Sequence, residues 1–403
     1  MNRNTTPSSS STTTLQLDHR TPTPTAKRQT LLSDLAADQN LLPGLPDHIA
    51  QLCLSHVPPS TIYSVSHSWR RLIYSPFYPP FLSLYALFLS TDTDNNTGSN
   101  SVNFHSFDPI SRKWQPLPPP PTDPPIRFIF RHPSYISRKL PIQSVAAAGK
   151  LVLLAATTEE FLPALSRPLV FDPLLKEWMY GPPFHAPRRW CAAGALSGVV
   201  YVASGIGSHY NNDVARSVEK WDPSRLDRAK QPRDWEKIRE MKDGKFSRDA
   251  IDAVGWRGRL CVVNVKGDFA KEGLIYDVGK DEWEEMPEGM LAGWKGPAAA
   301  MVEEEEDIYM VDESKGSLKK YDHVRDTWVV VVKYHEMLKG AQQVVAGGGR
   351  VCVLSADGVS IVVVNVAGLD PGRVWVVDAP PGFQGVAIHI LPRLSKVEDI
   401  ASK

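Results

Sequence analysis

Four copies of one eight-residue pattern decide the fold of this chain: FDPISRKW at 107–114, FDPLLKEW at 171–178, YDVGKDEW at 276–283 and YDHVRDTW at 321–328. In each copy an aromatic residue directly precedes Asp, and Trp follows six residues after that Asp. The pattern predicts a strand that ends in an inward-facing aromatic, a turn opened by Asp, and a second strand that begins at Trp. The Asp carboxylate suits this turn because it can accept a backbone N–H bond from two residues further on.

Two weaker copies extend the series to six. Trp221-Asp222 reaches its tryptophan only at Trp235, as though a loop rich in Lys, Arg and Pro had been inserted into the turn. A degenerate copy has Val364-Asn365 and then Trp375. Across the series the tryptophans recur at intervals of 45 to 64 residues, which is typical of a repeat protein.

Apolar hairpins lie between these units, each made of two short runs rich in Ala and Val around a tight turn. They are SVAAAGKLVLLAA at 144–156, CAAGALSGVVYVAS at 191–204, IDAVGWRGRLCVVNV at 251–265, PAAAMVEEEEDIYMVD at 297–312 and QQVVAGGGRVCVLS at 342–355. One hairpin plus one Asp-to-Trp pair makes four strands, and four strands in about fifty residues form the blade of a propeller. The sequence therefore predicts a mainly β protein with a six-bladed propeller.

The first blade lacks a preceding hairpin, and this predicts how the ring closes. It contains YALFLS, VNFHSF and the strand that begins at Trp114, while the chain ends with an orphan strand, GVAIHILP at 385–392. Because an open array of sheets would leave exposed edges, we expect the orphan strand to complete the first blade.

A small helical segment precedes the propeller. Residues 1–40 are rich in Ser, Thr and Pro and are expected to form a disordered tail. Residues 41–82 predict three short helices, with Ile49, Leu52 and Cys53 on one face of the first and Ser60 as the N-cap of the second. Three helices this short bury little surface, so the segment needs a partner or the next domain to complete its packing. The propeller is expected over 83–395, followed by a C-terminal tail over 396–403.

Bulk composition narrows the function classes. Lys plus Arg and Asp plus Glu both number 45, so no net field would attract a nucleic acid or an anionic membrane. No apolar stretch reaches the length of a membrane span, and the four cysteines, Cys53, Cys191, Cys261 and Cys352, lie far apart. We expect a soluble intracellular protein with reduced cysteines, located in the cytoplasm, the nucleus or both.

The segment 41–82 resembles an F-box at a set of apolar and Trp-Arg positions, namely Leu45, Pro46, Ile49, Val65, Trp69, Arg70 and Leu72. The rest resembles kelch repeats, although the double glycine common in such repeats survives only in fragments. The combination is similar to the plant F-box/kelch-repeat proteins of the Skp-interacting type. The resemblance implies a non-catalytic subunit of an SCF (Skp–cullin–F-box) ubiquitin ligase, in which the F-box binds a Skp adaptor and, through it, a cullin, and the propeller binds a target protein.

Other interpretations of these residues remain open. Each of the six adaptor-binding candidates, Leu45, Pro46, Ile49, Val65, Trp69 and Leu72, can instead hold the small helical core. Kelch rings also serve as scaffolds of galactose-oxidase-like copper enzymes, and a scaffold that works without a ligase is a further alternative. The histidines show no ligand spacing and no nucleophile or phosphate-binding motif is present, so neither a metal nor another cofactor is predicted. The acidic run 303–307 is interpreted as a solvated hairpin tip.

Target contacts are expected from Arg and aromatic residues in the longer loops between blades, because such side chains dominate protein interfaces. The candidates are Arg131, Tyr135, Arg188, Trp190, Tyr210, Arg248 and Trp294. The identity of the target does not follow from a single sequence.

Overall fold

A computed structural model describes residues 41–57, 59–75, 77–78, 81–90, 101–122, 126, 142–158, 160–226, 234–244, 246, 251–264, 272–301, 307–367 and 371–393. The chain divides into two compact units, Met1–Ile73 and Tyr74–Lys403. This boundary, after Ile73, lies nine residues before the end of the predicted helical segment 41–82. The two predicted tails, 1–40 and 396–403, and the acidic tip up to residue 306 lie outside the described residues.

The first unit contains three short helices, α2 (Asp47–Ser55), α3 (Pro59–Val65) and α4 (His67–Ile73). Ser60 does not cap α3 as predicted, because the helix already begins at Pro59, whose fixed φ suits a first helical turn. The described side chains buried in this unit are few and apolar: Ala50, Leu54, Ile62, Leu72 and Ile73.

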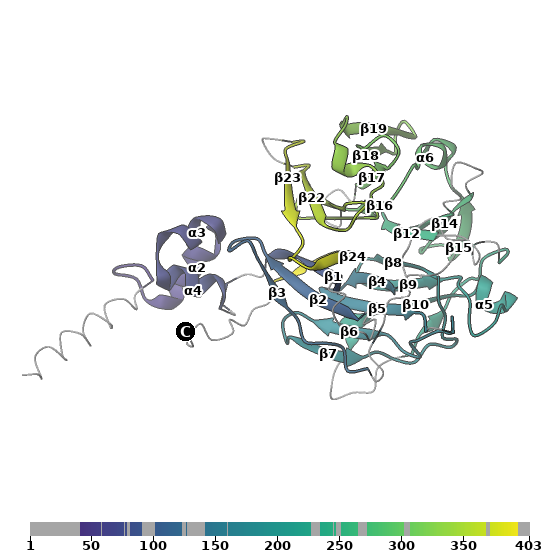
Figure 1. The fold of residues 1–403 in the computed structure, drawn as a ribbon, viewed down its shortest axis with the longest axis horizontal. Helices are drawn as coiled ribbons and strands as arrows, with labels where there is room; N and C mark the ends of the chain where they lie inside the picture. The colour runs from purple at the N-terminus through teal and green to yellow at the C-terminus, as the bar shows by residue number, and fades with distance from the viewer. Residues whose placement is uncertain are drawn as a thin grey trace, which may run out of the picture. The chain divides into compact units, whose positions relative to one another are not determined.

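The second unit contains six four-stranded antiparallel sheets within its described residues, which confirms the predicted six-bladed propeller (Figure 1). We number the blades along the chain. Blade 1 is β24 (Phe383–Pro392), β1 (Leu82–Ser90), β2 (Val102–Asp108) and β3 (Lys113–Pro116); blade 2 is β4 (Ile142–Ala147), β5 (Lys150–Ala156), β6 (Leu169–Asp172) and β7 (Glu177–Tyr180); blade 3 is β8 (Ala192–Leu196), β9 (Val199–Ala203), β10 (Val218–Trp221) and β11 (Glu236–Lys237). Blade 4 is β12 (Ile251–Trp256), β13 (Arg259–Asn264), β14 (Glu272–Asp277) and β15 (Glu282–Glu285); blade 5 is β16 (Ala298–Ala300), β17 (Ile308–Asp312), β18 (Ser317–Asp322) and β19 (Thr327–Val332); blade 6 is β20 (Gln343–Gly347), β21 (Arg350–Leu354), β22 (Ser360–Asn365) and β23 (Val374–Asp378). Short helices α5 (Asn212–Arg216) and α6 (Glu288–Gly293) lie in connections between strands.

The blades form a closed ring around an axis. The first strand of each blade contacts the first strand of the next, in the order β24, β4, β8, β12, β16, β20 and back to β24. Each gap between neighbouring blades holds its own apolar cluster; the one between blades 1 and 2 includes Tyr85, Leu153 and Phe171, all fully buried. The core of this unit is therefore divided into layers between sheets.

The Asp turns use the predicted hydrogen bond in all five copies that retain Asp. A carboxylate oxygen accepts the backbone N–H two residues on, at Asp108–Ile110 (3.1 Å), Asp172–Leu174 (2.9 Å), Asp222–Ser224 (2.9 Å), Asp277–Gly279 (3.0 Å) and Asp322–Val324 (3.0 Å). The repeated Asp is thus explained by turn chemistry.

The tryptophans join neighbouring blades. In five blades the indole Nε1–H donates to a backbone carbonyl associated with the preceding blade: Trp114 to Asp378, Trp178 to Pro118, Trp235 to Pro182, Trp283 to Arg239 and Trp328 to Met290. The sixth blade differs from the prediction. Val374 pairs with Val364 and takes the place of the tryptophan, so Trp375 lies one position further along and is 36% exposed.

The orphan C-terminal strand closes the ring as predicted. β24 pairs antiparallel with β1 from Leu82–Pro392 to Ser90–Phe383. Beyond it, the Arg393 guanidinium donates to Asp108 at 3.1 Å and stacks 3.8 Å from the ring centre of Tyr74. A charged clasp therefore anchors the end of the closing strand.

Candidate functional site

The helical unit is held together by side chains that satisfy backbone groups. Trp69 Nε1 donates to the carbonyl of Leu41 at 2.6 Å, and Arg70 Nε donates to the carbonyl of Tyr63 at 2.5 Å. The same guanidinium lies 4.7 Å from the centre of the Tyr63 ring. Trp69 thus connects α4 to the start of the segment and Arg70 connects α4 to α3, which accounts for a Trp-Arg pair in so small a module.

Helix α2 has an apolar stripe on its exposed side. Ile49, Leu52 and Cys53 follow the i, i+3, i+4 spacing of one helix face, and all three are exposed, with Leu52 at 61%. The opposite side is also apolar and buries Ala50 and Leu54. The described residues of this unit therefore cover only one of the two apolar sides of α2.

The structure separates the six predicted adaptor contacts. Leu45 (39% exposed), Pro46, Ile49 (38%) and Val65 (55%) are exposed. Trp69 is half-buried, and Leu72 is buried in the helical core at 4%. Leu72 therefore offers no surface to a partner in this arrangement, whereas the four exposed residues do.

Leu52 is the exposed residue that the list of candidates missed. Its place on the same helix face as Ile49 follows from the spacing alone, but the motif positions of the F-box do not include it. We call Leu45, Ile49, Leu52 and Val65 the exposed apolar set.

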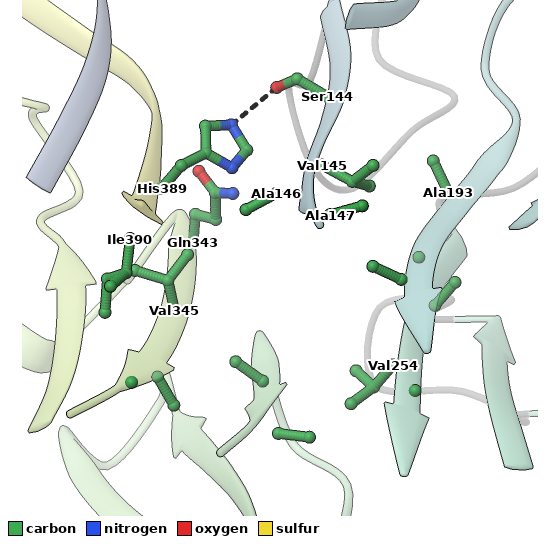
Figure 2. A pocket seen from close by; sticks show the side chains of 18 of the residues that line it. Ser144, Val145, Ala146, Ala147, Ala193, Val254, Gln343, Val345, His389 and Ile390 are labelled. Carbon is green, nitrogen blue, oxygen red and sulfur yellow. Dashed lines mark hydrogen bonds between the residues drawn. The ribbon is translucent and has the colours of Figure 1, made fainter. Parts of the chain in front are cut away.

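The propeller contains a cavity of about 550 Å³ along its axis, lined by the first strands of all six blades. Small side chains predominate in its lining, and no Asp, Glu, Lys or Arg is among its described residues. Figure 2 shows Ser144 and His389 on one side of it, joined by a hydrogen bond of 2.9 Å between Oγ and Nε2. This bond connects β4 to the closing strand β24.

His389 is neutral at ordinary pH. It is 2% exposed, and burial lowers the pKa of its imidazole to about 4. Gln343, next to it in Figure 2, uses its Oε1 to accept the backbone N–H of Ile388 at 2.7 Å. The Ser144–His389 bond links blade 2 to blade 1, and no carboxylate is among the described residues that line the cavity.

Two of the predicted target contacts are buried, which corrects the expectation that their side chains are exposed. Trp294 is fully buried between blades 4 and 5, where its large ring fills the apolar cluster. Arg188 is 1% exposed and forms an ion pair with Glu219 in β10, while its Nη1 donates to Ser217 Oγ at 2.7 Å. Burial of this charge is offset by those contacts, so Arg188 anchors its loop to blade 3.

The other target candidates have different positions. Tyr210 is 46% exposed and Trp190 is half-buried, with its backbone N–H donated to Gln143 Oε1 at 3.2 Å. Arg131, Tyr135 and Arg248 lie outside the described residues. A role in target binding stays a prediction for all five.

The last features of the described residues are the cysteines, the possible metal ligands and the length of the helices. Cys261 and Cys352 are buried, and burial raises the pKa of each thiol to about 12. Within the described residues no group of three or more His, Cys, Asp or Glu side chains is placed to hold a metal ion. No helix in that part of the chain is long and apolar enough to cross a membrane.

Comparisons with known proteins agree with this architecture. No family model matches the chain. It is 52% identical over 378 residues to the F-box/kelch-repeat protein SKIP25 of Arabidopsis thaliana, covering 93% of this chain and 94% of that protein. More distant relatives from the same plant are the F-box/kelch-repeat protein SKIP4, 24% identical over 81% of this chain and 85% of the relative, and the F-box protein AFR, 25% identical over 64% and 65%. With a helical unit, a closed six-bladed ring and this degree of identity, the chain belongs to the F-box/kelch-repeat protein family.

Proposed function

We propose that this chain is the target-recruiting subunit of a Skp–cullin–F-box ubiquitin ligase. In this proposal the helical unit binds a Skp-type adaptor, the adaptor connects it to a cullin, and the propeller presents a target protein. The chain itself performs no chemistry in this role. A cytoplasmic or nuclear location is part of the proposal, and a fluorescent fusion of the full chain would test it.

The observation that carries the proposal is the outward apolar stripe of α2. Fully burying a Leu or Ile side chain stabilises a complex by about 1.5–3 kcal/mol. A partner that covers Leu52 and Ile49 would gain this contribution at little cost to the fold, because neither side chain takes part in the helical core. An amphipathic helix laid against a groove is a common mode of protein recognition.

The names of the relatives support the assignment of roles. SKIP25 and SKIP4 are named F-box/kelch-repeat proteins, and AFR is named an F-box protein. An F-box in front of a propeller suits an adaptor with two binding surfaces, one for the ligase and one for the target.

Co-purification with a Skp adaptor tests the proposal. The variant Ile49→Asp/Leu52→Asp places two carboxylates on the stripe and is expected to lose the adaptor. The control His67→Asp adds a carboxylate at an exposed position of α4 and is expected to retain it. Retention by the stripe variant, or an unmodified chain that never binds the adaptor, would favour a scaffold that works without a ligase.

The target can be sought with the same pair of proteins. A chain that binds targets but cannot join the ligase should accumulate them, because they are no longer ubiquitinated and degraded. Proteins that associate more strongly with Ile49→Asp/Leu52→Asp than with the unmodified chain, and whose lifetimes depend on the latter, would be the candidates. If no associated protein changes its lifetime, the target-recruiting role is wrong.

A further inference from the structure

The axial cavity of the propeller has the size and the lining of a site for a small organic molecule. Its volume of about 550 Å³ lies within the range of about 300–1,000 Å³ that is usual for ligand pockets. Most of the described residues around it are Ala, Gly and Val from the first strands of the blades and their turns. These short side chains leave the centre of the ring open, and they give the cavity a mainly apolar wall.

One end of the cavity reaches the surface of the propeller. Ala148 lies in the turn between β4 and β5, and Ser197 lies in the turn between β8 and β9. Both residues line the cavity and both are exposed. Gly149 and Gly198 occupy the second position of the same turns and have no side chain to narrow this end. A molecule from solvent can therefore enter between these hairpin turns.

His389 of β24 offers the cavity a ring nitrogen that has no partner. Its Nε2 bonds Ser144 Oγ at 2.9 Å, and no hydrogen bond joins its Nδ1 to any described residue. The residue as a whole is 2% exposed, yet Nδ1 is not one of the partnerless side-chain atoms that the described residues seal completely. Since this side chain lines the cavity, Nδ1 is accessible to whatever occupies it.

Gln343 of β20 offers an amide donor beside that nitrogen. Its Oε1 accepts the backbone N–H of Ile388 at 2.7 Å, and no described residue accepts a hydrogen bond from its Nε2. Figure 2 shows the Gln343 amide next to the imidazole of His389. Gln342 also lines the cavity but differs, because its Nε2 donates to the carbonyl of Ala356. An open amide donor and an open imidazole nitrogen thus lie together in a mainly apolar cavity.

The lining favours an uncharged ligand. No Asp, Glu, Lys or Arg is among the described residues that surround the cavity. Burial also keeps His389 neutral at ordinary pH, since it lowers the pKa of the imidazole to about 4. A charged molecule would give up hydration here without meeting an opposite charge, which makes its binding unfavourable.

We propose that the axial cavity binds an uncharged, mainly apolar organic molecule whose carbonyl or hydroxyl oxygen bonds to Gln343 Nε2 and His389 Nδ1. Gln343 donates to this oxygen. When the Ser144 hydroxyl donates to Nε2, Nδ1 carries the ring proton and donates to a carbonyl; when Nε2 donates to Ser144, Nδ1 accepts from a hydroxyl. The apolar body of the ligand packs against the Ala and Val side chains. This site goes beyond the proposed ligase role and does not depend on it.

Three probes with one carbon skeleton test the class of ligand. Camphor carries a ketone, borneol carries a hydroxyl in its place, and camphorsulfonate keeps the ketone and adds a negative charge. Titrations of the full chain followed by saturation-transfer difference NMR should show saturable binding of camphor and borneol, and at least about ten-fold weaker binding of camphorsulfonate. The proposal is overturned if neither uncharged probe binds, or if camphorsulfonate binds as tightly as camphor.

Two variants that add the same charge test the polar contact. Gln343→Glu keeps an oxygen for the N–H of Ile388 but removes the open donor, whereas Gln342→Glu adds a carboxylate to the lining and leaves Gln343 intact. The first should weaken camphor binding at least about five-fold more than the second, because the ketone loses its donor. Equal weakening would show that charge alone matters and would contradict the contact with Nε2. Matching unfolding midpoints would show that both variants are folded.

The ring nitrogens of His389 report the contact in the unmodified chain. In a chain with ¹⁵N-labelled histidine, the signals of His389 are those that disappear in His389→Gln. Camphor should shift the Nδ1 signal, because the new hydrogen bond forms at that atom. An unchanged Nδ1 signal would mean that the cavity holds water only, and probe binding that Ile49→Asp/Leu52→Asp abolishes would place the probe on α2. Either result overturns the proposal.

Discussion

The helical unit and the propeller use apolar side chains in opposite ways. In the propeller, Leu151 and Leu153 of β5 are at most 1% exposed and fill the layer between blades 1 and 2. In the helical unit, Leu52 is 61% exposed at a position where helical spacing calls for an apolar residue. Among its described residues the propeller thus buries the apolar side chains of its inner strands between blades, and the large apolar residues that stay exposed lie mainly in turns and outer strands, such as Leu174, Leu175 and Val324. Among the described residues the helical unit leaves Ile49 and Leu52 of α2 exposed, and this is the surface that the proposed adaptor would cover.

Among the changes considered, removing the closing strand β24 should destabilise the propeller most. A chain that ends after Gly382 loses β24, and blade 1 then exposes the edge of β1 and part of two apolar clusters. We expect the propeller not to fold. Near-ultraviolet circular dichroism and urea unfolding would check this, and a truncated propeller that unfolds cooperatively would contradict the assigned closure.

Truncating one leucine in each unit compares them directly. Leu153→Ala should lower the free energy of unfolding by about 2–5 kcal/mol because it leaves a cavity in the packed layer. Leu52→Ala should change it by no more than about 0.5 kcal/mol, as expected for an exposed site. Urea titrations followed by tryptophan fluorescence and by circular dichroism would measure both. Similar costs would mean that α2 is packed as tightly as β5.

Acid should weaken the propeller through His389. Its pKa is about 4 in the folded chain and about 6.5 in the unfolded chain, so between these values the unfolded chain binds more protons. The stability contributed by neutral His389 is therefore fully present above pH 6.5 and is lost as the pH falls toward 4. At pH 5 the loss should be about 2 kcal/mol.

The variant His389→Gln provides the control for this effect. It removes the titrating group and keeps an amide that can bond Ser144, so its stability should change less between pH 7 and pH 5. Urea unfolding of both proteins at the two pH values would check the prediction. An unmodified chain whose stability is equal at both would contradict a buried neutral imidazole between blades 1 and 2.

A smaller effect is expected at the Asp turns. Asp322→Ala removes the acceptor of the Val324 N–H and should cost about 1 kcal/mol, the usual contribution of one hydrogen bond. Asp322→Asn retains a carbonyl acceptor and should cost less. Thermal unfolding of the two variants would rank them, and equal destabilisation would show that the negative charge, rather than the bond, matters at this turn.

The sequence was sufficient for most of the propeller because its signals are local and repeated. Each Asp turn depends on contacts within three residues. The orphan strand at the C-terminal end of the sequence matches the first blade, which lacks one strand. The position of Trp375 was predicted incorrectly because a single-residue shift in the longer β22–β23 connection moves a side chain to the opposite face of its strand.

The candidate binding residues were harder to predict because burial depends on the whole ring. Arg188 and Trp294 occur in loops, where exposed side chains are common, yet one pairs with Glu219 and the other fills an apolar layer. Conversely, β19 contains four consecutive valines, and two of them, Val329 and Val330, are each 47% exposed. Neither outcome follows from local pattern, because both depend on residues distant in the chain.

The most direct test of the account measures stability and adaptor affinity on one preparation of Leu52→Asp. Since Leu52 is outside the helical core, the unfolding midpoint should match that of the unmodified chain, while calorimetry with a Skp-type adaptor should show at least about ten-fold weaker binding. A variant that binds the adaptor with unchanged affinity would contradict the claim that the exposed stripe of α2 is a binding surface. A variant that loses stability and affinity together would show that Leu52 supports the fold instead.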